Sequence, residues 1–592
     1  MNGHAFKEED IRKTKDQPVL RRLLYLTGPY RPYLIAALLS ALISVTLQLL
    51  APVLIGRAID YVIGPGEVYF ADMAGVLIVL AVTIGISAIF QWILTFCTNK
   101  LTFYTVRDLR DITFSRLNVV PLKYIDTKTH GNIINTVVND IDQVSDGLLQ
   151  GFAQLFTGVV TILGTLGFML SINIPIAFLV VVLTPLSFFV AGFISRRVSR
   201  KFKEQSMIRG ELTGYINEML GNQKIVKTFH YEDRAQVQFE EINERLHECG
   251  ILAQFYSSLT NPCTRFVNGV VYAAVGIFGS LSAISGRLTV GQLSSFLSYA
   301  NQYTKPFNEI SGVITELQAA IASAKRIFAV IDEASEPDDS ELIEEVECDG
   351  TVEACHVDFS YVPEKPLIED FNLSVRAGQR IAIVGPTGCG KTTLINLLMR
   401  FYDVNAGRIS VSGINIQDMK RSALRGMYGM VLQETWLFHG TVRENILYGR
   451  ENASDEEMVA AAKAAHAHSF IERLPDGYDT VISEDGGNIS QGQKQLLCIA
   501  RIMLTKPPML ILDEATSNID TRTELRIQKA FHKLMEGRTS FIVAHRLSTI
   551  KESDRILVMN AGRIIEQGTH EELLKKGGFY ANLYNSQFAA NS

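Results

Sequence analysis

The first half of the chain is dominated by long stretches that contain few or no charged residues. A helix that crosses a bilayer needs about 20 predominantly apolar residues, and each stretch reaches that length or nearly so. The longest stretch is divided by Ser171–Pro175, which predicts two spans joined by a tight turn. The pattern predicts six membrane-spanning helices. The stretches are residues 32–56, 73–99, 147–195, 249–286 (charged only at Arg265) and 288–304.

The connections between these stretches differ in length and charge. Those near residues 57–72, 171–175 and 284–288 are short and contain only Arg57 and Arg287 as basic residues. The other two, residues 100–146 and 196–248, are long and rich in Lys and Arg. Basic loops stay on the cytoplasmic side of a membrane. We therefore expect both long connections and both chain termini to be cytoplasmic.

The long connections have a pattern of helix, short break and helix. Apolar positions such as Ile134, Val138 and Ile141 follow helical spacing, which predicts that the spans continue unbroken into the cytoplasm. An arm of about 20 helical residues extends about 30 Å. We expect the breaks, Leu122–His130 and Asn222–Phe229, to be tips that dock on a soluble domain.

The segments that flank the spans differ from them in composition. Residues 1–31 begin with a polar tail without a secretory signal pattern and end in a mixed apolar and basic segment, which suits a helix at the membrane surface. Residues 32–332 would form the transmembrane domain. Residues 333–350 are acidic and unpatterned, which indicates a linker, and residues 351–592 alternate short apolar strands with helices, as in an α/β nucleotide-binding domain.

A glycine-rich loop lies between a strand pattern, Ile381–Val384, and a helix pattern, Leu394–Met399. Backbone N–H groups of such a loop and the helix N-terminus can surround a phosphate. In this pattern Lys391 would reach the β- and γ-phosphates and Thr392 would bind Mg²⁺. A chance Gly-rich turn is the alternative, and the strand–loop–helix context argues against it. The loop reads Gly385, Pro386, Thr387, Gly388, Cys389, Gly390, Lys391, Thr392 and Thr393.

Two further motifs fit a nucleotide site. Residues 509–514 form a buried strand pattern that ends in two carboxylates, so Asp513 is a candidate Mg²⁺ ligand and Glu514 a candidate base for an attacking water. Ser490 is a predicted N-cap of a helix that runs to Leu504. This second anion site has no evident use within one domain, but two copies facing head to tail would use it.

The amino-acid composition excludes few classes of function. The net charge of −6 gives no electrostatic argument for nucleic-acid binding, and we expect none. The seven cysteines are scattered without zinc spacing, so we expect them to be reduced.

The order of the motifs resembles that of the ATPase domain of ABC transporters, for which ATP and Mg²⁺ are the cofactors. Gln433 matches the family's Q-loop, which touches Mg²⁺ and contacts the membrane arms. The run Ser490, Gln491, Gly492 and Gln493 resembles the Ser-Gly-Gly-Gln signature motif. By the same resemblance, ATP is closed over by the signature helix of a second chain.

Three more residues are implied by the resemblance. Asp520 ends the D-loop, His545 matches the switch histidine, and Tyr361 matches the aromatic residue that stacks on adenine. The whole chain from about residue 18 resembles an exporter-type ABC half-transporter. The expected fold is a six-helix transmembrane domain followed by an α/β P-loop ATPase domain with a RecA-like core and a helical subdomain.

The chain departs from the family pattern at Gln491, where glycine is usual, and at Asn518-Ile519 in the D-loop. Such departures resemble those of bacterial heterodimeric multidrug exporters, in the chain that retains the catalytic glutamate. Because Glu514 and His545 are both present, we expect this chain to supply the hydrolytic residues. A homodimer remains an alternative.

The expected function is ATP-driven export of hydrophobic or amphipathic compounds, drug-like or lipid-like, across the bacterial cytoplasmic membrane by one half of a dimer. The alternative is a membrane ATPase that gates a channel or regulates a partner without pumping. The expected partners are a second half-transporter chain, the lipid bilayer and a small hydrophobic substrate.

Overall fold

The computed structural model describes residues 11–12, 14–64, 67–432, 435–483, 489–513, 519–543 and 550–587. The chain forms two compact units. The first comprises Met1–Val120 and Lys128–Ala334, and the second comprises Pro121–Thr127 and Ser335–Ser592. Each unit is built around hydrophobic clusters of its own.

Within the residues that the structure describes, the first unit is helical apart from one small hairpin. Its six long helices correspond to the six stretches predicted from the sequence. The elements are α2 (Val19–Leu26), η1 (Gly28–Tyr30), α3 (Arg31–Asp60), β1 (Val62–Gly64), β2 (Glu67–Val68), α4 (Phe70–Leu117), α6 (His130–Asn135), η2 (Thr136–Asp140), α7 (Ile141–Ile172), α8 (Ile174–Gly221), α9 (Gln223–Thr228), α10 (Glu232–Ile284) and α11 (Val290–Ile331).

Four helical stretches are long and apolar enough to cross a membrane among the residues that the structure describes. They are Gly28–Asp60, Phe70–Leu117, His130–Ile172 and Arg265–Ile284. Helix α8 contributes a shorter apolar stretch, Ile174–Thr184. Spanning by α8 and α11 therefore stays a prediction.

The predicted breaks and turns lie where the sequence indicates. Helix α8 ends at Gly221, and the short α9 separates it from α10. Asn173 alone connects α7 to α8, and its side chain accepts a hydrogen bond from the Ile176 N–H at 3.2 Å. A single N-capping residue therefore reverses the chain.

The cytoplasmic segment that leads into α7 differs from the prediction of an unbroken α-helix. The segment is helical, but η2 is a π-helical turn that ends at Asp140. Asp140 accepts hydrogen bonds from Ser323 at 3.0 Å and from Arg326 at 2.8 Å, both on α11. These bonds, between residues far apart in the sequence, hold α11 against the π turn.

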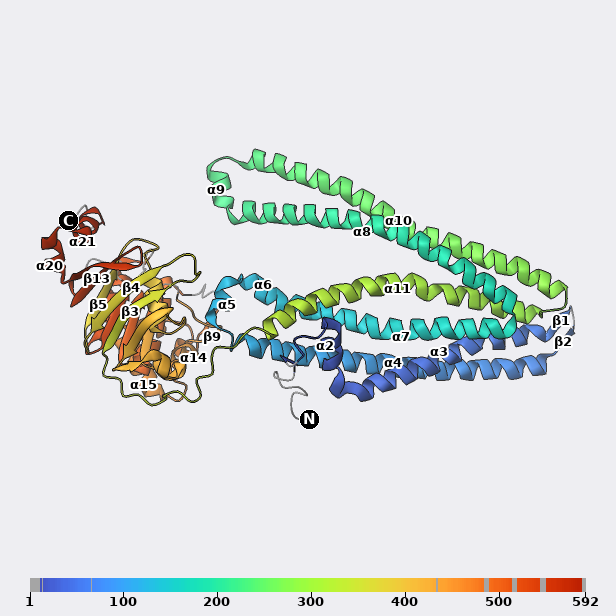
Figure 1. The fold of residues 1–592 in the computed structure, drawn as a ribbon, viewed down its shortest axis with the longest axis horizontal. Helices are drawn as coiled ribbons and strands as arrows, with labels where there is room; N and C mark the ends of the chain where they lie inside the picture. The colour runs from blue at the N-terminus through green and yellow to red at the C-terminus, as the bar shows by residue number, and fades with distance from the viewer. Residues whose placement is uncertain are drawn as a thin grey trace. The chain divides into compact units, whose positions relative to one another are not determined.

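The long helices pack in pairs. Helices α8 and α10 run side by side, and toward α9 they separate from α3, α4, α7 and α11 (Figure 1). The other four are held closely together. A Cβ on Gly147 of α7 would overlap with Ala320 of α11, and one on Gly56 of α3 would overlap with the backbone of Gly291 of α11. Close approach of these helices therefore requires the glycines.

The second unit contains two main sheets and surrounding helices. Its elements are α5 (Leu122–Thr127), β3 (Val352–Phe359), β4 (Ile368–Val375), β5 (Arg380–Val384), α12 (Lys391–Leu398), β6 (Ala406–Val411), β7 (Ile414–Asn415), η3 (Ile416–Asp418), α13 (Arg421–Gly426), β8 (Tyr428–Val431), β9 (Gly440–Thr441), α14 (Val442–Leu447), α15 (Asp455–Ala464), α16 (His468–Ile471), η4 (Gly477–Asp479), β10 (Val481–Ile482), α17 (Gln491–Thr505), β11 (Met509–Asp513), α18 (Thr521–Met535), β12 (Thr539–Val543), β13 (Arg555–Asn560), β14 (Arg563–Gly568), α20 (His570–Lys576) and α21 (Phe579–Gln587).

The larger sheet has the strand order β14-β13-β5-β12-β11-β8 and is parallel except for the β13–β14 hairpin. Side chains of β5 alternate between two cores: Ile381 and Ile383 belong to one, and Ala382 and Val384 to the other. The sheet is therefore buried on both faces, as its continuous apolar strands predict. An antiparallel sheet, β4-β3-β6-β7, packs in the core that contains Ile381.

Short-range hydrogen bonds and backbone conformations define several helix starts and one turn in this unit. Ser454 and Thr569 each form a capping box at the start of a helix. The β13–β14 turn has Ala561 at φ 46° and Gly562 at φ 78°, so both central residues take the left-handed conformation that favours a two-residue hairpin. All seven cysteines are free.

Candidate nucleotide site

The glycine-rich loop connects β5 to α12, as the sequence predicts. Gly388 has φ 81° and Gly390 has φ 104°, a conformation that L side chains rarely adopt. A Cβ on Gly385 would overlap with the carbonyl oxygen of Met559, so the loop passes close to β13. The Gly562 N–H donates to the carbonyl oxygen of Cys389 at 3.1 Å, which fixes the loop to the β13–β14 hairpin.

The polar groups of the loop fit a bound phosphate. The Lys391 ammonium donates to the carbonyl oxygens of Gly385 at 2.7 Å and Pro386 at 3.1 Å, so it lies over the loop. Thr392 is exposed at the start of α12, whereas Cys389 is only 3% exposed. Glycine backbone, a lysine and an accessible hydroxyl at a helix N-terminus are together suited to a nucleoside triphosphate.

Tyr361 lies beside the first turns of α12. Its hydroxyl donates to the Thr393 hydroxyl at 3.3 Å and accepts from the Asn396 amide at 3.2 Å. Its ring packs edge-on against Tyr402, with ring centroids 4.9 Å apart. The structure thus brings the predicted adenine-stacking residue next to the glycine-rich loop, although the two are about thirty residues apart in sequence.

The remaining candidates follow neighbouring strands of the parallel sheet. Strand β11 ends at Asp513 and pairs with β12, which pairs with β5, so Asp513 and the glycine-rich loop lie at the same edge of the sheet. Such an edge is where ligands bind in open α/β sheets. Gln433, Glu514 and His545 follow β8, β11 and β12 within two residues in sequence, and all three lie outside the described residues.

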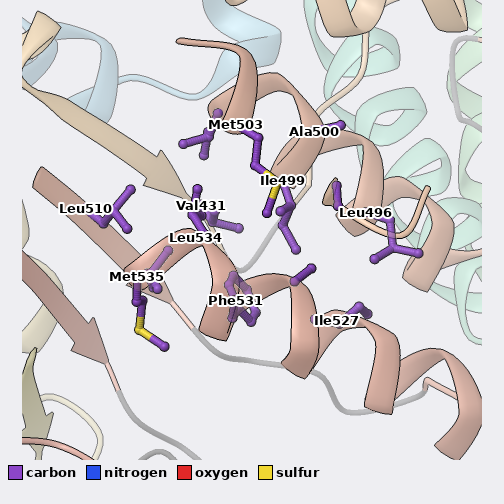
Figure 2. Packing of buried hydrophobic residues seen from close by; sticks show 14 of the residues in the cluster. Val431, Leu496, Ile499, Ala500, Met503, Leu510, Ile527, Phe531, Leu534 and Met535 are labelled. Atoms are coloured by element: carbon purple, nitrogen blue, oxygen red, sulfur yellow. The ribbon is translucent and has the colours of Figure 1, made fainter. Parts of the chain in front are cut away.

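The signature motif begins helix α17, as predicted from Ser490. The Ser490 hydroxyl accepts from the Gln493 N–H at 3.3 Å, and the Gln493 side chain accepts from the Ser490 N–H at 2.8 Å, a reciprocal capping box. Apolar residues fix this helix to α18 and to strands β8 and β11 (Figure 2). They are Leu496, Ile499, Ala500 and Met503 of α17, Ile527, Phe531, Leu534 and Met535 of α18, and Val431 and Leu510 of the sheet.

The two middle positions of the motif have different environments. Gly492 is buried, and a Cβ there would lie under 3.0 Å from Cγ2 of Thr523 and 3.1 Å from Cγ2 of Ile519. Gln491 is exposed, and its amide donates to the Thr435 hydroxyl at 3.0 Å. Packing therefore requires glycine at position 492 and accepts a longer side chain at position 491.

Asp520 caps helix α18. Its carboxylate accepts from the Thr523 N–H at 2.9 Å, and this backbone hydrogen bond is the main reason that the pKa of Asp520 lies below its usual value. The capping bond places Asp520 directly beside the helix pair that carries the signature motif.

Two functional candidates were not apparent from the sequence. The Tyr402 hydroxyl donates to the Asp126 carboxylate of α5 at 2.5 Å, and burial with this bond raises the pKa of Tyr402. The break segment of the first arm is thus linked through Tyr402 to the ring of Tyr361. Neither Tyr402 nor Thr435, which bonds to Gln491, belongs to a motif that a single sequence would reveal.

Comparison with known proteins identifies the family. Residues 34–307 match the ABC transporter transmembrane region, and residues 368–517 match the ABC transporter family. An uncharacterized ABC transporter ATP-binding protein of Bacillus subtilis, YfiC, is 40% identical over 97% of this chain and 95% of its own length. The chain belongs to the ABC transporter family. It is of the exporter type, with a helical transmembrane domain followed by the ATPase domain.

Two other relatives of this ABC transporter have names that state a cargo. A fatty acid ABC transporter ATP-binding/permease protein of Mycobacterium bovis is 42% identical over 86% of this chain and 81% of its own length. An ATP-dependent lipid A-core flippase of Syntrophus aciditrophicus is 33% identical over 96% of this chain and 94% of its own length. The ABC transporter described here binds ATP, couples ATP hydrolysis to transmembrane export, and is a multi-pass protein of the cytoplasmic membrane with a cytoplasmic ATPase domain.

Proposed function

We propose that this ABC transporter exports hydrophobic or amphipathic compounds by alternating access, as one chain of a heterodimer. The observation that supports a dimer is an apolar surface on the arm formed by α8, α9 and α10. Its residues lie in the basic, cytoplasmic part of the chain, so without a partner chain they would be exposed to water. They are Phe202, Met207, Leu220, Ile225, Phe229 and Val237, which are between 43% and 76% exposed.

Large apolar side chains that are exposed along one arm indicate a candidate protein interface. The most exposed residue is Phe229, at 76%, directly after α9. The ATPase domain has an exposed aromatic surface of its own, with Trp436 at 57% and Tyr448 at 59%. We expect the α9 tip of one chain to insert its aromatic residue into this surface of the other chain.

Each candidate residue has a separate role in ATP binding or hydrolysis. Tyr361 would stack on the adenine, the glycine-rich loop and Lys391 would hold the phosphates, and Thr392, Gln433 and Asp513 would hold Mg²⁺. Bound Mg²⁺ would supply positive charge that offsets the negative charge of the phosphates. Glu514 accepts the proton of the attacking water, and His545 completes the hydrolytic set.

The signature helix serves the ATP site of the other chain. Ser490 is exposed at the N-terminus of α17, where backbone N–H groups favour a γ-phosphate. Contacts with that phosphate exist only when the two ATPase domains are closed, so binding favours closure and hydrolysis releases it. The arms transmit this closure to the membrane helices.

A heterodimer is favoured by Gln491. This residue replaces the usual glycine in the motif that this chain presents to its partner, whereas its own site retains Glu514 and His545. The chain would thus supply a complete hydrolytic set and a modified signature. Lipid-like cargo is favoured by the relatives that are named for fatty acid and for lipid A-core.

The test is to purify the complex from its native host and to identify its polypeptides. Two different half-transporters are expected, and a single polypeptide would refute the heterodimer. Inverted vesicles with this complex should accumulate a fluorescent lipid or drug against its gradient when ATP is supplied. ATP hydrolysis without accumulation would favour a gating ATPase instead.

The matched variants are Phe229→Ser on the arm and Ile565→Ser on the ATPase domain, where Ile565 is 41% exposed. Phe229→Ser should lower dimer recovery and accumulation, and Ile565→Ser should change neither. Equal effects of the two would exclude a specific docking role for α9.

A further inference from the structure

Helix α2 has apolar residues on both of its faces. Leu23 and Leu26 are buried against the long helices. Leu20, Leu24 and Tyr25 are between 40% and 46% exposed on the opposite face. A helix at a protein–water boundary would have a polar outer face, so this surface is suited to an apolar neighbour.

The buried face of α2 also contains a charged residue. Arg22 is 4% exposed, and its guanidinium donates two hydrogen bonds, both 2.7 Å long, to the two carboxylate oxygens of Asp332. The guanidinium also lies 4.0 Å from the ring centroid of Phe328. A bidentate, buried pair of this kind has one geometry, so it fixes α2 to the end of α11.

Asp332 occupies a distinctive place in the chain. It is the residue that follows the last turn of α11, and the main segment of the second unit starts at Ser335. The next residue, Glu333, is also held, because the buried Arg116 at the end of α4 donates to its carbonyl oxygen. The segment that connects the membrane helices to the ATPase domain is therefore fixed to α2 and α4.

We propose that α2 binds the anionic lipid surface of the cytoplasmic leaflet, and that the Arg22–Asp332 pair transmits this binding to the junction between α11 and the ATPase domain. Anionic lipid then orders the junction and raises the rate of ATP hydrolysis. The proposal rests on the ATPase activity of the family and is independent of the cargo and of the partner chain.

Lipid, and not a protein, is the occupant favoured by position and charge. Only η1 separates α2 from α3, the first apolar stretch long enough to cross the membrane. The exposed charged residues of this segment are mainly basic: Lys15, Arg21 and Arg31, with Asp16 as the acidic exception. An exposed face with apolar and basic residues matches an interface with anionic headgroups.

The first experiment measures ATP hydrolysis by the full complex in vesicles in which phosphatidylglycerol progressively replaces phosphatidylcholine. Wild-type turnover should rise with phosphatidylglycerol. One basic residue near an anionic surface contributes about fivefold to binding, so Arg21→Gln should shift the half-maximal response to a higher phosphatidylglycerol content. Arg57→Gln is the matched control, because Arg57 is exposed at the opposite end of α3.

The second experiment separates lipid binding from its transmission. Arg22→Lys and Asp332→Asn remove the bidentate pair and leave the exposed face of α2 intact. Both should keep turnover in pure phosphatidylcholine but lose the rise with phosphatidylglycerol. The exchange Arg22→Asp with Asp332→Arg should restore part of the response, which a loss of folding would not allow.

Hydrogen exchange provides a readout that does not depend on hydrolysis. In the wild type, phosphatidylglycerol should slow exchange in residues 19–26 and also in residues 328–334, whereas in Asp332→Asn it should slow exchange only in the former. Unchanged wild-type exchange in residues 19–26 would refute lipid binding by α2. If turnover and exchange in Asp332→Asn respond to phosphatidylglycerol as in the wild type, the role of the Arg22–Asp332 pair is refuted. If Arg21→Gln and Arg57→Gln have equal effects, the response depends on surface charge in general, and specific binding by α2 is refuted.

Discussion

Replacement of Gly492, in the signature motif, by alanine should destabilise the packing of the ATPase domain. A Cβ at this position would meet Cγ2 of Thr523 at under 3.0 Å and Cγ2 of Ile519 at 3.1 Å. The hydrophobic packing between α17 and α18 holds both helices in place, so neither can move away freely. Overpacking of this kind costs about 1–3 kcal/mol.

The effect on activity should exceed the effect on folding. A shift of α17 away from α18 also moves Ser490, whose hydroxyl caps the helix and which we propose serves the ATP site of the other chain. Gly492→Ala should therefore lower turnover by about one to two orders of magnitude, the rate equivalent of 1.4–2.8 kcal/mol. Measurement of ATPase rates and of urea unfolding of the purified complex would separate the two effects.

A second substitution tests the stated cause. Thr523→Ala removes the methyl group that the new Cβ would meet and keeps the backbone N–H that donates to Asp520. The double variant Gly492→Ala with Thr523→Ala should regain stability and part of the activity. Wild-type stability and turnover in Gly492→Ala alone would refute the packing argument.

Four other substitutions have specific expected outcomes. Gln491→Ala and Thr435→Val each remove the same exposed hydrogen bond, which is worth about 0.5–1 kcal/mol. Each variant should therefore change the ATPase rate by no more than about fivefold, and the double variant should show no further change. Additive effects of the two substitutions in a double-mutant cycle would exclude coupling between these residues. Tyr402→Phe removes the bond to Asp126, so substrate-stimulated hydrolysis should fall while basal hydrolysis persists, and unchanged stimulation would contradict a coupling role. Glu514→Gln should retain ATP binding in a filter assay but lower turnover by about 10²–10⁴, and undiminished hydrolysis would contradict its role as base.

Most of the helices and strands were predictable because their signals are local. Long uncharged stretches located the membrane helices, and the strand–loop–helix pattern located the glycine-rich loop between β5 and α12. Ser490 was predictable as a cap because its capping box depends only on residues within one turn. Signals of this kind need no knowledge of tertiary contacts.

Features that depend on distant contacts were not predictable. The π turn that ends at Asp140 is held by Ser323 and Arg326, which are more than 180 residues away. The bond between Tyr402 and Asp126 joins residues 276 positions apart. Contacts between residues so far apart leave no periodic pattern in the sequence. The sequence therefore indicated the break segment of the first arm but not Tyr402, which bonds to it.

The connections on the outer side of the membrane are short. A small hairpin of β1 and β2 follows α3, Asn173 alone connects α7 to α8, and residues 285–289 connect α10 to α11. There is no room in these connections for a receptor domain that could capture a compound from the surroundings. Antibodies raised against the cell exterior would therefore find few residues of this chain to bind.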